Sequence, residues 1–453
     1  MFVCWLPYYI CTYPGVVSND SITQLKQILE LEPLSNGNPV FQTFLWGAFV
    51  KLGQWVGSAD AGVALYCCLQ AILMAMLVGR TLQEMSRGGA PRYLLMGSMG
   101  FFAFCPVFPL FAFCVGKDTN FGMATLFLAL LVWQFLQLEK GAKASVWFTI
   151  ALCVAAALTL LLRNPGAYLA MLTLVLVLVW TLFQKDGRQS KRWVAPAYAL
   201  GVTGVLWLVM HLALMPSLNA LPMPETEEYS LPLQQVARVV ASQGDSLTAQ
   251  EREAIDAVMD IEALQAAYQG ELSDPVKLLW KESAPPAEKS RFFQTWLSLV
   301  GKYPATCFSA FFHNTYGYVC PGYLSAIKPT LLIGKQGHTT DTEGLFPFSV
   351  NPRSEKLKDA MDGVSRNDIL CVLLSPGLYG WIAVFVLAVL LGSRHKRLLL
   401  AAVPALFSLA GCMLSAVNGY FRYAMPLYFS APLLLALAAQ ALALQRSKEE
   451  AYP

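Results

Sequence analysis

Residues 144–183 have the sequence ASVWFTIALCVAAALTLLLRNPGAYLAMLTLVLVLVWTLF, in which only Arg163, Asn164 and Pro165 separate two apolar runs. Each run contains no Asp, Glu, Lys or Arg. At 1.5 Å per residue, a helix of this length reaches about 27 Å, close to the roughly 30 Å hydrocarbon core of a bilayer. The stretch therefore predicts two transmembrane helices joined by a tight polar turn.

The same pattern recurs along the chain. Seven further uncharged stretches are long enough to cross a bilayer, and a shorter apolar run, residues 1–13, opens the chain. The seven stretches are 61–79, 93–116, 119–138, 193–215, 371–392, 398–419 and 423–445. Together these segments predict an all-α integral membrane protein with about ten transmembrane helices.

Composition supports this fold class and excludes others. Of 453 residues, 56% are hydrophobic and 13% are charged, about half the charged share of a soluble domain. The net charge of +3 is too small for a nucleic-acid partner. The eleven cysteines form no CxxC pair and no Cys/His cluster, so they predict small buried side chains and no metal site.

Basic residues gather in every second loop. They are Arg80, Arg87 and Arg92; Lys140 and Lys143; Lys185, Arg188, Lys191 and Arg192; Arg394, Lys396 and Arg397; and Arg446 and Lys448. Because loops rich in Lys and Arg remain in the cytoplasm, this alternation predicts a cytoplasmic C-terminus from Arg446 onwards. The intervening loops, including 14–60 and 216–370, are expected on the extracytoplasmic side.

The apolar segment 39–56 is the one ambiguous piece. A crossing there would reverse the orientation of every later loop, so we expect it to lie along the membrane interface. Trp46 and Trp55 would then sit at the level of the lipid headgroups.

Three parts of the chain follow from this topology. Residues 1–215 form an N-terminal membrane domain with the first outer loop, 14–60, and seven spans. Residues 216–370 form a mainly helical extracytoplasmic domain, because they hold 19 of the 29 acidic and 13 of the 32 basic residues. Within it, Thr248 and Glu251 have the spacing of a capping box. Residues 371–453 form a C-terminal membrane domain with three spans and a cytoplasmic tail.

Isolated charges at the outer membrane ends are the candidate functional residues. Asp20 and Asp118 are candidate catalytic carboxylates, and Lys117, Arg163 and Arg422 are candidate ligands for a donor phosphate. Arg binds phosphate oxygens in bidentate fashion, and a carboxylate accepts a proton from a hydroxyl. Further candidate substrate-binding residues are Asn164, Tyr420, Tyr423 and Arg238, although the surroundings of Arg238 favour a solvated side chain.

Short motifs carry a resemblance to a known group of enzymes. They are Pro14-Gly15, Asp20-Ser21, Gln24, Asn38-Pro39, Lys117-Asp118, Arg163-Asn164 and Arg422-Tyr423. With the topology, they resemble an uncharacterised bacterial multi-pass membrane family similar to the GT-C glycosyltransferases, which include protein O-mannosyltransferases and lipid A aminoarabinose transferases. The resemblance implies transfer of a sugar from a polyprenyl-phosphate donor to an extracytoplasmic acceptor, which is a cell-envelope glycan, lipid or protein.

The resemblance also implies that an acidic residue of the first outer loop is the base, and only Asp20 matches. Many GT-C enzymes have two adjacent acids there, whereas this chain has Asn19-Asp20-Ser21. This departure argues against a metal at the site and leaves Asp20 to act alone, while a divalent cation, Mg or Mn, stays open as a cofactor. Two other functions also stay open: a polymerase or ligase of lipid-linked polysaccharide, and a transporter or flippase of lipid-linked glycans. The segment 93–116, a helix expected to be broken by Pro106 and Pro109, keeps the transporter open.

Overall fold

A computed structural model describes residues 1–139, 141–325 and 349–451. In this part of the chain, six helices are long and apolar enough to cross a membrane. They are α4 (Ala59–Arg87), α7 (Lys117–Leu136), α9 (Gly166–Phe183), the run Val194–Ser217 formed by α11 (Val194–Val209), η1 (Met210–Leu214) and α12 (Met215–Ser217), the run Lys396–Met413 formed by η7 (Lys396–Leu398) and α22 (Leu399–Met413), and Met425–Arg446 within α23 (Met425–Ala451). The chain is therefore a mainly helical membrane protein, as the sequence predicted.

Three shorter apolar helices accompany these six. They are α1 (Phe2–Thr12), α8 (Val146–Leu162) and α21 (Pro376–Gly392). A break at Ser375 and Pro376 separates α21 from the short helix α20 (Leu370–Leu374), because Ser375 is extended before the proline. The total of about ten crossings stays a prediction.

The predicted span 93–116 is not one continuous helix but is broken at Pro106, one of the two prolines that indicated a broken helix. Helix α5 (Arg92–Phe104) ends where Cys105 adopts an extended conformation before Pro106. Proline disfavours a helical conformation in the preceding residue and lacks the N–H that the helix needs. A short buried helix, α6 (Val107–Ala112), and strand β2 (Cys114–Val115) follow.

Helix α7 lies at the centre of the bundle. In the most apolar 18-residue stretch of α7, 83% of the stretch is buried inside the protein, whereas in that of the run Val194–Ser217 only 17% is buried. Helix α7 packs against α8, α22 and α23, and the four polar residues that open it, Lys117 to Asn120, are thereby fixed at one end of the bundle. The exposed surface of the outer helices is apolar, as lipid contact requires.

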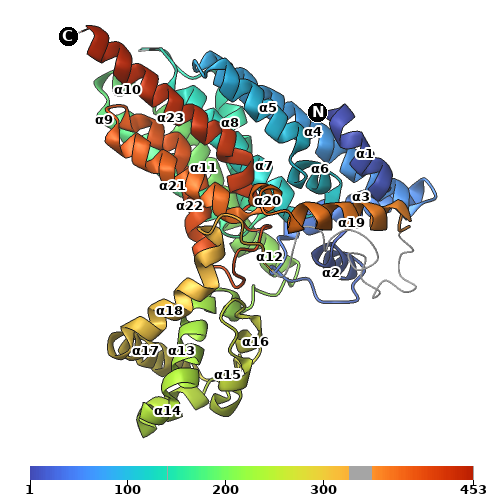
Figure 1. The fold of residues 1–453 in the computed structure, drawn as a ribbon, viewed down its shortest axis with the longest axis vertical. Helices are drawn as coiled ribbons and strands as arrows, with labels where there is room; N and C mark the ends of the chain where they lie inside the picture. The colour runs from blue at the N-terminus through green and yellow to red at the C-terminus, as the bar shows by residue number, and fades with distance from the viewer. Residues whose placement is uncertain (140, 326–348, 452–453) are drawn as a thin grey trace.

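A helical subdomain projects from that same end of the bundle, whereas the C-terminus lies at the opposite end (Figure 1). The subdomain comprises α13 (Ser230–Gln243), η3 (Gly244–Ser246), α14 (Ala249–Asp256), α15 (Ile261–Ala267), α16 (Asp274–Lys277), α17 (Pro286–Lys302) and α18 (Pro304–Thr315). It has its own hydrophobic core, built around Phe292, Ile255 and Leu233. The predicted capping box of Thr248 and Glu251 is present at the start of α14.

Helices α2 (Asn19–Ile28), α3 (Val40–Trp55) and α19 (Arg353–Arg366) lie at the end of the bundle from which the subdomain projects, which we call its base (Figure 1). Helix α10 (Lys185–Gln189) packs against α9 at the opposite end. Two 3-10 turns, η2 (Glu225–Glu227) and η4 (Tyr316–Tyr318), complete the described helices. The prediction of Trp46 at the lipid headgroups was wrong, because its ring is completely buried and its indole N–H donates to the carbonyl of Ser21 (3.0 Å). Trp55, by contrast, is 84% exposed.

Candidate functional site

Two strand-to-helix junctions build the site. Strand β1 (Val16–Val17) pairs in parallel with β2, with Val16 opposite Cys114. Helix α2 begins two residues after β1, and α7 begins two residues after β2, so the pairing brings the two helix N-termini together. Asp20 lies in the first turn of α2 and Asp118 in the first turn of α7. Both carboxylates therefore gain from the positive end of a helix dipole.

Hydroxyl groups lock the first junction onto the second. Ser21 donates a hydrogen bond to the carbonyl of Val115 (2.8 Å), and Ser18 donates to the same carbonyl (3.3 Å). Gly15 allows the chain to enter β1, since its φ is +149° and a Cβ at this position would lie 2.5 Å from the Cys67 sulfur, which leaves no place for a side chain. The position of Asp20 is thus set by strand pairing and by close packing.

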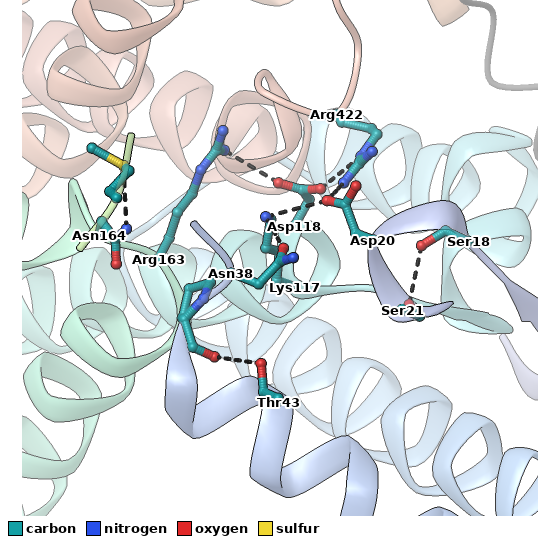
Figure 2. A network of polar contacts seen from close by, with 12 residues as sticks. Ser18, Asp20, Ser21, Asn38, Thr43, Lys117, Asp118, Arg163, Asn164 and Arg422 are labelled. Carbon is teal, nitrogen blue, oxygen red and sulfur yellow. Dashed lines mark hydrogen bonds and ion pairs between the residues drawn. The ribbon is translucent and has the colours of Figure 1, made fainter. Parts of the chain in front are cut away.

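Arg422 joins the two carboxylates. Its Nη2 lies 2.6 Å from Oδ2 of Asp20, and its Nε lies 2.7 Å from Oδ2 of Asp118. Lys117 adds a second cation, with Nζ at 3.2 Å from Oδ2 of Asp20. Asn38 accepts a hydrogen bond from this ammonium group (2.5 Å). Figure 2 shows these side chains converging from separate elements.

Arg163, the residue that ends α8, contributes a third cation to the cluster. Its Nη1 lies 3.4 Å from Oδ1 of Asp118, and its guanidinium lies 4.7 Å from the ring centroid of Tyr423. A second aromatic ring, Phe121, is 5.6 Å away. Two aromatic faces and one carboxylate therefore hold this cation, and cation–π contact orients it toward Asp118.

The two carboxylates differ in access to solvent. The Asp118 side chain is 4% exposed, whereas that of Asp20 is 31% exposed. Burial raises the pKa of Asp20, but Lys117 and Arg422 outweigh burial and hold this pKa well below its usual range. Burial lowers the pKa of Arg422, and Asp118 and Asp20 together raise it well above its usual value. Asp20 and Arg422 are therefore both charged at neutral pH.

One family model matches the chain. It is described as a family of unknown function (DUF6020), and it covers residues 30–451. The chain belongs to the DUF6020 family. No curated protein and no solved structure matches the chain.

Most of the predicted site residues of this DUF6020 chain lie in one place. The structure brings together Asp20, Lys117, Asp118, Arg163, Tyr420, Arg422 and Tyr423. Within this group, Nη1 of Arg422 donates a hydrogen bond to the phenol of Tyr420 (3.2 Å). Of these residues, Asp20 precedes the matched range and the other six lie within it.

Two predicted residues do not join the cluster. The side-chain amide of Asn164 turns away from it and donates to the carbonyl of Asn36 (2.7 Å). Arg238 lies on α13 in the helical subdomain, with its guanidinium 5.4 Å from the ring centroid of Tyr268. It borders a cavity of about 240 Å³. Arg238 therefore lies in the helical subdomain, apart from the membrane-end residues, and its role in substrate binding stays a prediction.

The sequence reasoning missed a buried polar network beside the cluster. Gln42 donates to the phenol of Tyr66 (2.9 Å), and the amide of Asn120 donates to Gln42 (3.2 Å) and to Tyr66 (2.7 Å). Asn120 lies on α7, one turn after Lys117. The available signal was Gln42, a polar residue in the first turn of the largely apolar helix α3.

Proposed function

We propose that this protein is a membrane glycosyltransferase that moves a sugar from a polyprenyl-phosphate donor to an extracytoplasmic acceptor. The supporting observation is the charge of the cluster at the base of α7. Three cations, Lys117, Arg163 and Arg422, meet two carboxylates, which leaves an excess of one positive charge. The phosphate of a sugar phosphodiester carries one negative charge, so its binding neutralises the cluster.

The proposed reaction uses Asp20 as the base. The acceptor hydroxyl oxygen attacks the anomeric carbon of the donor, and its proton passes to the carboxylate of Asp20. The bond between the anomeric carbon and the phosphate oxygen breaks, and polyprenyl phosphate leaves with the electron pair. Arg422 and Lys117 stabilise the charge that develops on that oxygen.

The donor itself prepares Asp20 for this role. In the free protein, Lys117 and Arg422 hold the pKa of Asp20 so low that the carboxylate is a weak base. A donor phosphate competes for both cations and so draws them away from Asp20. Asp118 stays between Arg163 and Arg422 and positions the two guanidinium groups.

A divalent cation does not fit this cluster. Each carboxylate already meets two cationic side chains, and the excess charge is positive before any metal arrives. A metal such as Mg or Mn would be repelled by Lys117, Arg163 and Arg422. The proposed reaction therefore uses no metal ion.

The break between α5 and α6 favours a second candidate, a flippase of lipid-linked glycans. Interrupted helices are typical of transporters, and the short helix α6 that follows this interruption leads into β2. The two candidates separate in purified vesicles. A flippase moves the lipid-linked glycan between leaflets and leaves it intact, whereas a transferase consumes it.

The orientation of the chain is the first testable prediction. If basic loops stay in the cytoplasm, the helical subdomain and the charge cluster face outward. We expect alkaline phosphatase to be active when fused near residue 260 and inactive when fused after residue 446. The reverse pattern would place the cluster on the cytoplasmic side and exclude an extracytoplasmic acceptor.

The second prediction concerns donor binding by Lys117. Loss of a charge-assisted hydrogen bond costs about 1.5–3 kcal/mol, so Lys117→Gln should weaken donor binding by about 10- to 150-fold. This side chain is 15% exposed, lies at the margin of the cluster and can be replaced without stranding Asp118. Equilibrium binding of a fluorescent polyprenyl-phosphate sugar to purified protein measures the effect.

The matched control is Lys302→Gln, which removes a lysine paired with Glu251 in the helical subdomain. It should leave donor affinity unchanged. Equal affinities of the Lys117→Gln protein and the unmodified protein would contradict a phosphate site at this cluster.

A further inference from the structure

The loop that carries Arg422 is held by the helical subdomain. Ser273 donates from its backbone N–H (2.8 Å) and its hydroxyl (2.9 Å) to the carbonyl of Ala416. Asn418 donates its backbone N–H to the carbonyl of Glu271 (2.8 Å) and accepts the N–H of Gly317 on its side-chain oxygen (2.7 Å). The subdomain and the charge cluster therefore share one continuous junction.

The buried phenol of Tyr318 fastens this junction. It donates to the carbonyl of Val417 (3.0 Å) and accepts the N–H of Tyr420 (3.1 Å). Tyr420 in turn contacts Arg422 through its own phenol. The residues of the junction, such as Val417 and Tyr420, therefore lie within a few residues of Arg422 along the chain.

The ring of Tyr323 packs against two glycines of the junction, Gly317 and Gly419. A Cβ at Gly317 would lie 2.6 Å from the Tyr323 ring, and a Cβ at Gly419 would lie 2.8 Å from it. Gly419 also has a φ of +57°, which glycine adopts without strain. Only glycine at both positions leaves room for this edge of the ring, Cδ1 and Cε1, beside the loop that leads to Arg422.

A row of aromatic rings runs from Tyr323 along α18. We call it the aromatic row, and it consists of Phe308, Phe312, Tyr316 and Tyr323. Rings of Phe308 and Phe312 stack at 6.4 Å, Phe312 and Tyr316 stack at 6.0 Å, and Tyr316 meets Tyr323 at 4.7 Å. Phe308 is 66% exposed and Phe312 is 49% exposed, so these rings present free faces.

A carboxylate completes the row at its inner end. Both phenols donate to Glu271, Tyr316 to one oxygen and Tyr323 to the other at 2.6 Å. Burial and the bond to Glu271 raise the pKa of Tyr323, so its hydroxyl stays protonated. A carboxylate has about four lone-pair sites, and the phenols use two. The exposed Glu271 can therefore accept hydroxyl groups of a ligand.

The charge of the subdomain limits the kind of ligand. Residues 216–325 contain 13 acidic and 7 basic side chains, a net charge of −6. Such a surface repels anionic polymers and anionic lipid headgroups. Exposed rings beside a hydroxyl-accepting carboxylate suit the apolar faces and hydroxyl groups of an uncharged sugar chain.

We propose that the aromatic row with Glu271 is the docking surface for a neutral glycan acceptor, which it leads toward Arg422 and Asp20. The role as acceptor rests on the proposed transferase function. The binding of a neutral saccharide does not, and it can be measured without any donor.

The test uses the full chain in nanodiscs and, as probes, neutral and acidic oligosaccharides released by mild hydrolysis from the envelope of the host cell. We expect the neutral pool to bind, and Phe312→Ala or Tyr316→Ala to weaken that binding about tenfold. Leu278→Ala, which alters a side chain of the subdomain that is 86% exposed, is the matched control and should have no effect.

Three outcomes would overturn the proposal: no binding of the neutral pool, equal binding by the Phe312→Ala protein, or preference for the acidic pool. A photo-crosslinker at position 312 in native membranes gives an independent readout. Capture of saccharide supports the proposal, whereas capture of membrane lipid overturns it. If saccharide binds at the row but no transfer occurs, the docking surface stands and the transferase function fails.

Discussion

Asp20→Asn is expected to lower the rate of sugar transfer by about 10²- to 10⁴-fold. General-base catalysis typically supplies this factor, and asparagine keeps the size of the side chain while removing the proton acceptor. Asp20 is the carboxylate with access to solvent, since 31% of its side chain is exposed. Single-turnover transfer from a radiolabelled polyprenyl-phosphate sugar measures the chemical step.

Asp118→Asn is the matched control, because Asp118 meets the same guanidinium group but is 4% exposed. We expect it to reduce stability and donor affinity, while folded protein retains transfer. If Asp118→Asn abolishes transfer and Asp20→Asn does not, the two roles are reversed. Transfer at the unmodified rate by a protein with both changes would exclude carboxylate catalysis at this site.

The pH dependence tests whether the donor frees Asp20. In the free protein, Lys117 and Arg422 hold the pKa of Asp20 below its usual range, so kcat/KM should keep its value down to a pH below about 4. With donor bound, the cations turn to the phosphate, and the pKa of Asp20 rises. The acid limb of kcat should therefore lie at a higher pH than that of kcat/KM, and coincident limbs would contradict the competition.

Arg422→Gln is expected to lower the free energy of unfolding by about 3–5 kcal/mol, the typical cost of removing one partner of a buried ion pair. Arg422 is 13% exposed, and its loss leaves Asp118 with Arg163 alone, at 3.4 Å. Donor binding should also fall, but the instability prevents a simple interpretation. Thermal unfolding in detergent measures the first effect directly.

A second change separates the two effects. Combining Asp118→Asn with Arg422→Gln removes the stranded carboxylate, so we expect stability to recover in part while donor affinity stays low. If the double variant is no more stable than Arg422→Gln alone, the contact between Arg422 and Asp118 does not contribute as an ion pair. Full recovery of donor affinity would remove Arg422 from the phosphate site.

The sequence predicted the membrane class and much of the site, for physical reasons that differ. Apolar stretches such as 166–183 are stable only in lipid or in a large protein core, so their pattern alone predicted the membrane class. Lys117, Arg163 and Arg422 stood out because each charge lies against an apolar run. Their convergence depends on how the helices pack, and the sequence could only suggest it.

The errors have equally specific causes. Residues 93–116 lack charges and therefore meet a hydropathy criterion for a span, and only their prolines indicated the break, which Pro106 causes for steric reasons. Trp46 suits an interface by composition, but its ring is buried and its indole bonds to the carbonyl of Ser21. The network of Gln42, Tyr66 and Asn120 joins three helices, and no local pattern connects them.

The pairing of β1 with β2 restricts which changes in chain length the protein can accept. Hydrogen-bond register shifts only in whole residues, about 3.3 Å each, so the two carboxylates cannot be brought closer or moved apart gradually. One residue added between Val17 and Asp20 would rotate the start of α2 by about 100° and turn its carboxylate away from Arg422. Residues added at 88–91, between α4 and α5, would leave both junctions in register. Insertions are therefore expected to be rare in the two short junctions and tolerated in that loop.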